Sequence, residues 1–101
     1  MVKHIVFFSL VDAAEGKSKA EHAQIIKKEL ENLTNFIPEI VSMEVGVNHP
    51  DASELNFDMA LYSQFESMED LNTYVQHPEH KRVAAYIAKV RTKRAAVDYV
   101  V

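Results

Sequence analysis

Residues 2 to 11 form an almost unbroken apolar run, and this run constrains the fold more than any other stretch of the chain. Alternate side chains of a strand point to opposite faces, so both faces here carry large apolar groups. One face holds Val2, His4, Val6, Phe8 and Leu10, and the other holds Ile5, Phe7, Ser9 and Val11. In a domain of 101 residues, one layer of helices covers only one side of a sheet. We therefore expect the second face to pack against another copy of the chain.

A helix and then a pair of strands are predicted after this first strand. Ser18 and Glu21 have the spacing of a capping box, which indicates a helix start after a loop at residues 12–17. Apolar side chains then recur every three or four residues until Pro38 ends the helix. Residues 41–48 and 56–65 alternate between apolar and polar, with turn residues between them, which predicts a β-hairpin.

The segment from Tyr74 to Ile87 contains a helix break between two histidines. Pro78 lacks an amide hydrogen and has a fixed φ, so it suits the first turn of a helix and pushes His77 into an extended conformation. A short helix capped by Ser67 is therefore expected to end at His77, and a new helix to begin at Pro78. His80 should face the interior, because apolar residues follow it at helical spacing: Val83, Ala84, Ile87 and Val90.

A last alternating run from Ala95 to Val101 predicts a fourth strand. The order β-α-β-β-α-β is that of a ferredoxin-like α+β fold, with a four-stranded antiparallel sheet and its helices on one face. The bare face should drive two subunits together into a dimeric α+β barrel. We expect one such domain over residues 1–101, as a homodimer.

Composition and charge exclude several classes of protein. The chain has no cysteine, so the fold needs no oxidising compartment, and the N-terminal run lacks the cleavage site of a signal peptide. We expect a cytoplasmic protein that does not enter a membrane. A net charge of −4 would repel a phosphate backbone, and the strand at residues 56–63 lacks the glycine-aromatic signature of RNA-stacking proteins. Nucleic acid is therefore not an expected partner.

Two distant segments together resemble the stress-responsive α/β-barrel, or Dabb, family. These are Val2-Lys-His-Ile-Val-Phe-Phe8 and Leu71-Asn-Thr-Tyr-Val-Gln-His-Pro-Glu-His80, and the likeness covers nearly the whole chain. The resemblance implies a homodimeric α+β barrel of two ferredoxin-like subunits. Many members have no assigned activity, some plant members are linked to stress tolerance, and others are polyketide cyclases that fold a poly-β-ketone into an aromatic ring.

In the cyclases, the opening-strand histidine and the second histidine of His-Pro-x-His form the acid/base machinery, with tyrosines assisting. Carried over residue by residue, the resemblance implies His4, His80 and Tyr74 as the catalytic candidates. A further tyrosine of the first helix falls near Leu30 here, and an aliphatic side chain cannot transfer a proton. This departure argues against the same substrate and reaction.

The chemistry has a physical rationale of its own. An intramolecular aldol closure needs a base that removes a proton α to a carbonyl and a donor that stabilises the enolate. In this interpretation His80 is the base, Tyr74 donates a hydrogen bond, and His4 orients the base or polarises the carbonyl. The expected pocket takes a small ketone-bearing or aromatic ligand without a cofactor. Its candidate ligand-binding residues are Val6, Phe8, Leu30, His77 and Val83.

Other interpretations stay open for these residues. His77 and His80 could bind a metal with His4 or a carboxylate, but Pro78 pulls His77 out of the helix, so no metal site is expected. The domain could instead be a binding or stability module without turnover, or a dimeric ferredoxin-like monooxygenase that takes a flat substrate such as heme or a quinol. Outside the pocket, His22 and His49 are expected in solvent, and Tyr86 and Tyr99 in packing roles.

Overall fold

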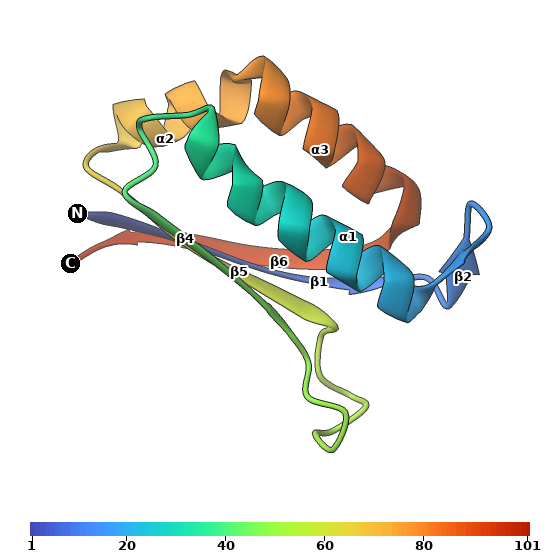
Figure 1. Cartoon of the computed structure of the whole chain (residues 1–101). Helices are drawn as coiled ribbons and strands as arrows, with labels where there is room; N and C mark the ends of the chain where they lie inside the picture. Colours follow the sequence, from blue (N-terminus) through green and yellow to red (C-terminus); the bar gives the residue numbers. More distant parts are fainter.

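The computed structural model describes all 101 residues and contains a four-stranded antiparallel sheet whose helices all lie on one face (Figure 1). Its main elements, in chain order, are β1 (Val2–Leu10), α1 (Lys19–Asn32), β4 (Ser42–Val47), β5 (Met59–Phe65), α2 (Met68–Gln76), α3 (Pro78–Val90) and β6 (Arg91–Val100). Three short elements complete it, namely β2 (Ala13–Ala14), β3 (Lys17–Ser18) and the 3-10 turn η1 (Leu33–Asn35). The predicted ferredoxin-like fold class is confirmed.

The strand order β4-β5-β1-β6 places the first apolar strand in the middle of the sheet. Both neighbours of β1 are antiparallel to it, and His4 lies between Ser63 of β5 and Asp98 of β6. The even-numbered residues of β1 face the helices and are buried, as the alternation predicted. Apart from His4, they pack with apolar side chains of the helices and of the other strands in a core of 19 residues that includes Ile26, Phe65 and Tyr74.

Three helix ends show the predicted capping chemistry. Ser18 accepts the Glu21 amide while the Glu21 carboxylate accepts the Ser18 amide, and Ser67 accepts the Asp70 amide. His77 is extended and serves both as the C-cap of α2 and as the N-cap of α3, with Pro78 in the first turn of α3. The break between the two late helices therefore lies where the sequence predicts it. None of the helices is long and apolar enough to cross a membrane.

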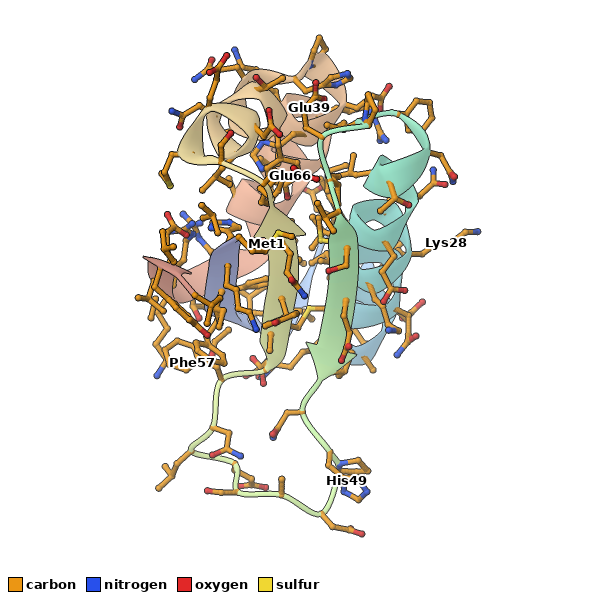
Figure 2. All side chains as sticks on the ribbon, turned by 90° about the vertical axis from the view of Figure 1, so that its left-hand side faces the viewer. Met1, Lys28, Glu39, His49, Phe57 and Glu66 are labelled. Carbon is orange, nitrogen blue, oxygen red and sulfur yellow. The ribbon has the colours of Figure 1, made fainter.

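Two strand boundaries differ from the sequence prediction. β6 begins at Arg91 rather than Ala95, because the β1 ladder continues past Phe8 to pair Leu10 with Arg91 across a bulge. β5 begins only at Met59, so residues 48–58 form a loop that extends beyond the end of the sheet. Figure 2 shows His49 in the part of this loop that lies away from the sheet, where it is exposed as expected.

The prediction that His22 lies in solvent is wrong. The segment predicted as a plain loop folds into the β2–β3 hairpin, with its turn at Glu15 and Gly16, both at positive φ. His22 is fully buried beneath it: its Nε2 donates to the Ala14 carbonyl at 2.7 Å, and its Nδ1 accepts from the Tyr86 hydroxyl. Tyr86 is half-buried and has the expected packing role.

The face of the sheet opposite the helices has no cover within the chain (Figure 1). Among its paired positions only Lys3 and Glu44 are charged, and Phe7, Val97 and Tyr99 are large apolar side chains at least 40% exposed. Every residue of the edge strand β6 is exposed. An uncovered sheet face of this composition is unusual for a monomer.

Candidate functional site

A cavity of about 250 Å³ lies between the helices and the sheet face that they cover. It is lined by His4, Val6, Phe8, Leu30, Leu61, Tyr74, His80, Ala84, Ile87, Arg91 and Arg94, which come from α1, α2, α3, β1, β5 and β6. A larger hollow of about 650 Å³ lies where the 48–58 loop leaves the sheet, but its only titratable side chain is the exposed His49. Of the histidines and tyrosines that line these two hollows, all but His49 lie in the smaller cavity.

Tyr74 is the central aromatic residue of this cavity. Its ring lies 4.5 Å from the His80 ring and 6.4 Å from the His4 ring, measured between centroids. The side chain is fully buried, and its hydroxyl has no hydrogen-bond partner. Burial raises the pKa of this hydroxyl far above its ordinary value of 10.0, so Tyr74 stays a phenol and can donate a hydrogen bond.

His80 enters the cavity from the first turn of α3. Its Nδ1 donates to the Val75 carbonyl at 3.0 Å, and because a carbonyl only accepts, this bond assigns the lone pair to Nε2. Burial lowers the pKa of His80 below its ordinary value of 6.5; the Val75 bond opposes that change, and the nearby charges of His4, Arg94 and His77 add to it. Near neutral pH the ring is therefore a neutral imidazole with a free basic nitrogen.

His4 is held by a carboxylate on the next strand. Its Nδ1 is hydrogen-bonded to Asp98 Oδ1 across the β1–β6 pair, where the two residues are in register. This bond fixes the ring orientation, as carboxylate–histidine pairs do in many sites. With Nδ1 engaged, Nε2 is the nitrogen left for a ligand: it accepts when the ring is neutral and donates when the ring is protonated.

The structure separates the remaining predicted residues into two groups. Val6, Phe8 and Leu30 line the cavity with His4, Tyr74 and His80. His77 and Val83 are not in its lining. The Nδ1 of His77 accepts the Glu79 amide at 3.0 Å as a helix cap, and Val83 is packed in the core. No group of three or more His, Cys, Asp or Glu side chains is arranged to hold a metal ion.

Three polar residues of the site were not predicted from the sequence: Asp98, Arg91 and Arg94. All three lie on β6, and the placement of its start at Ala95 left both arginines outside the strand. Period-two alternation extended back from Asp98 would have put Arg94, Ala96 and Asp98 on the face that carries His4. The sequence could therefore have indicated Arg94. Asp98 lay within the predicted strand without being assigned a role, and Arg91 lies beyond the bulge, where the alternation does not continue.

The family model and the curated relatives that this chain resembles carry the same domain name. The family model described as Stress responsive A/B Barrel Domain, or Dabb, matches residues 2–101. The Stress-response A/B barrel domain-containing protein DABB1 of Arabidopsis thaliana is 30% identical over 99% of this chain and 47% of its own length. A second stress-response A/B barrel domain-containing protein of the same plant is 29% identical over 82% of this chain and 30% of its own length. The chain thus spans about half or less of these curated relatives.

Solved structures show the same fold. A dimeric protein of unknown function with a ferredoxin-like fold from Bacteroides fragilis has a TM-score of 0.81 and 34% identity, covering 99% of this chain and 95% of that one. The hydroxynitrile lyase of Passiflora edulis has a TM-score of 0.78 and 24% identity over 99% and 92%, a likeness of fold alone. With a family model that matches residues 2–101, the chain belongs to the stress-responsive A/B barrel (Dabb) domain family.

Proposed function

We propose that this domain is a homodimer that binds a small ketone-bearing or aromatic molecule in the helix-covered cavity and uses His80 as a general base on it. The observation that carries the proposal is that His80, Tyr74 and His4 line one cavity whose other walls are mainly apolar, with the Tyr74 hydroxyl buried and unpartnered. A buried hydroxyl without a partner loses about 1–3 kcal/mol of hydration. A carbonyl oxygen of a ligand would recover that loss.

The size and walls of the cavity limit the ligand. A volume of about 250 Å³ is slightly below the roughly 300–1,000 Å³ of most ligand pockets, so a single ring with short substituents is the suitable size. Val6, Phe8, Leu30, Leu61 and Ile87 give the ring an apolar surface. The polar groups lie around this surface, where they can orient a carbonyl.

The proposed chemical step is enolisation. The Nε2 of His80 takes a proton from the carbon next to the ligand carbonyl, and the electron pair of the broken C–H bond moves onto the carbonyl oxygen. Tyr74 donates a hydrogen bond to that oxygen, and His4, held by Asp98, can add a second from Nε2 when its ring is protonated. The enolate then either regains a proton or attacks a second carbonyl of the same molecule, which is the ring-closing reaction of a cyclase.

The dimer is supported by the uncovered sheet face. Ile5, Phe7, Ala60, Val97 and Tyr99 lie on it, and a second copy would bury this apolar surface. The similar Bacteroides fragilis protein is described as dimeric. The cavity lies on the other side of the sheet, so dimerisation through this face leaves its lining intact. The cytoplasmic location stays a prediction.

Deuterium exchange tests the chemistry. The probes are 4-acetylbenzamide and 4-acetylbenzoate, whose acetyl methyl protons exchange through the enolate, followed by proton NMR in heavy water. We expect the protein to accelerate exchange at least about tenfold over imidazole at the same concentration. Binding without acceleration would contradict the general base and favour the non-catalytic binding module.

A matched pair of alanine variants checks that the cavity is the site. Ala84 lines the cavity, whereas Ala85, its neighbour on α3, is exposed. Ala84→Leu should fill the cavity and abolish acceleration, and Ala85→Leu should keep the wild-type rate. Equal effects of the two variants would place the reaction elsewhere and overturn the proposed site.

Light scattering after size-exclusion chromatography tests the dimer. Val97 is 52% exposed on the open sheet face, and Phe36 is 48% exposed in the connection that follows α1. A buried unpaired carboxylate is strongly unfavourable, so Val97→Glu should give a monomer while Phe36→Glu stays dimeric. A wild-type protein of monomer mass at micromolar concentration would refute the dimer.

A further inference from the structure

Two arginines of β6 lie in the lining of the cavity. Arg94 pairs with Phe8 and is on the same strand face as Ala96 and Asp98, which pair with Val6 and His4. Arg91 begins β6 and pairs with Leu10 beyond the bulge. Both residues are exposed and also line the cavity, so we place them at its opening. The apolar interior therefore opens past two guanidinium groups.

Neither of these guanidinium groups has an acidic partner. The chain has three arginines, and the third, Arg82, forms ion pairs with Glu29 and Glu79. Arg91 and Arg94 form no ion pair and no hydrogen bond through their side chains. The cavity lining contains no Asp or Glu, and the nearest carboxylate along β6, that of Asp98, is engaged by His4. A chain of net charge −4 thus keeps a local charge of +2 at this one opening.

Guanidinium groups recognise carboxylates through two parallel, charge-assisted hydrogen bonds. At the edge of an apolar cavity, such bonds are less screened than on open surface. A ligand with an apolar body and a terminal anion therefore matches both parts of the site. A neutral ligand of the same shape would leave the positive charges of Arg91 and Arg94 without a counter-charge at the edge of the cavity.

We propose that the ligand of this cavity is a small aromatic or apolar carboxylate, with its ring among the apolar walls and its carboxylate bound by Arg94 and Arg91. This inference rests on the proposed function and adds the charge of the ligand to it. Arg94 is then the principal specificity-determining residue, because it shares a strand face with Asp98, which holds His4. The carbonyl that reacts would lie at the opposite end of the ring, near Tyr74 and His80.

The two probes named above test the inference, since 4-acetylbenzoate and 4-acetylbenzamide differ in charge and hardly in shape. Isothermal titration of the intact protein should give at least about tenfold tighter binding of the benzoate. Arg94→Gln should reduce benzoate affinity about tenfold and leave benzamide affinity unchanged. Arg94→Lys should restore part of the preference, because it keeps the charge without the bidentate geometry.

Lys93 provides the matched control. It adjoins Arg94 in the sequence, but its ammonium lies over the Phe57 ring and is outside the cavity lining. Lys93→Gln changes the net charge by the same amount and should leave both affinities unchanged. Equal binding of the two probes to the wild-type protein, or equal effects of Arg94→Gln and Lys93→Gln, would overturn the inference while leaving the proposed pocket in place.

Failure of the proposed function would look different. Neither probe would then bind, or both would bind with the same affinity to Ala84→Leu as to the wild-type protein. Either result would remove the cavity as the site and the carboxylate inference with it. Added salt should weaken benzoate binding in the wild-type protein and not in the Arg94→Gln and Arg91→Gln double variant, and an unchanged salt dependence would contradict the role of the arginines.

Discussion

Two histidine–tyrosine clusters lie in this small domain, and they differ in how their polar atoms are satisfied. In the first, the fully buried His22 uses both ring nitrogens, one on the Tyr86 hydroxyl and one on the Ala14 carbonyl. In the second, Tyr74 packs against His80 and His4, yet its hydroxyl has no partner, and one nitrogen of each imidazole is left for a ligand.

This difference separates a structural cluster from a candidate active site. Buried polar groups in a stable core are almost always hydrogen-bonded. A buried group without a partner loses hydration free energy, and no hydrogen bond within the protein compensates for it. The His22 cluster meets that rule and ties the β2–β3 hairpin to α1 and α3. The Tyr74 cluster is an exception to that rule, because the Tyr74 hydroxyl is buried beside a cavity without a partner. Such exceptions are typical of positions that bind a ligand.

The largest expected effect concerns the base. His80→Gln should slow deuterium exchange of the probes by about 10²- to 10⁴-fold, because the amide cannot accept the proton. His22→Gln should keep the wild-type rate at a temperature where circular dichroism shows it folded. Loss of exchange in a folded His22→Gln protein would mean that the two clusters do not differ in the way proposed.

The next effect concerns stability. His22→Ala opens a cavity in the core and leaves the Tyr86 hydroxyl and the Ala14 carbonyl without a partner, so we expect about 3 kcal/mol less free energy of unfolding. Urea titration measures the difference. His49→Ala, which changes an exposed histidine of the 48–58 loop, should stay within about 0.5 kcal/mol of the wild type. Similar losses in both variants would contradict the structural role of His22.

The two tyrosines give smaller effects of opposite sign. Tyr86→Phe removes a hydroxyl that His22 uses, and should lower the free energy of unfolding by about 1 kcal/mol. Tyr74→Phe removes a hydroxyl that has no partner, and should raise it by about 1 kcal/mol while exchange becomes slower. Urea titrations that give the same sign for both would show that the Tyr74 hydroxyl is already satisfied without a ligand.

The smallest effect is on the pH dependence of stability. The pKa of His80 is lowered in the folded protein, so the unfolded chain binds its proton first as the pH falls. The contribution of His80 is therefore fully present above pH 6.5 and is lost as the pH falls through the folded value. Free energies of unfolding between pH 7 and pH 5 should decrease less in His80→Gln than in the wild type, and parallel curves would rule out a half-buried, neutral His80.

Local patterns predicted most of the fold, because capping boxes, the His77-Pro78 break and strand alternation act over a few residues. Spacing and family likeness also pointed to His4, Tyr74 and His80, which the structure brings to one cavity. The burial of His22 could not be read in this way, since it depends on a hairpin that folds over the helix. The role of Asp98 and Arg94 depends on the register between β1 and β6, strands from opposite ends of the chain.

The helix break at Pro78 also leaves the Val75 carbonyl without its usual helical hydrogen bond. In a continuous helix the Val75 carbonyl would accept the amide of Glu79, four residues on, but that amide turns to the ring of His77 instead. The freed carbonyl is the one that holds Nδ1 of His80. Pro78→Ala would allow α2 and α3 to join into one continuous helix. The Val75 carbonyl would then accept a backbone amide again, and the His80 imidazole would be free to rotate. A single proline thereby couples a bend in the main chain to the choice of which nitrogen is basic.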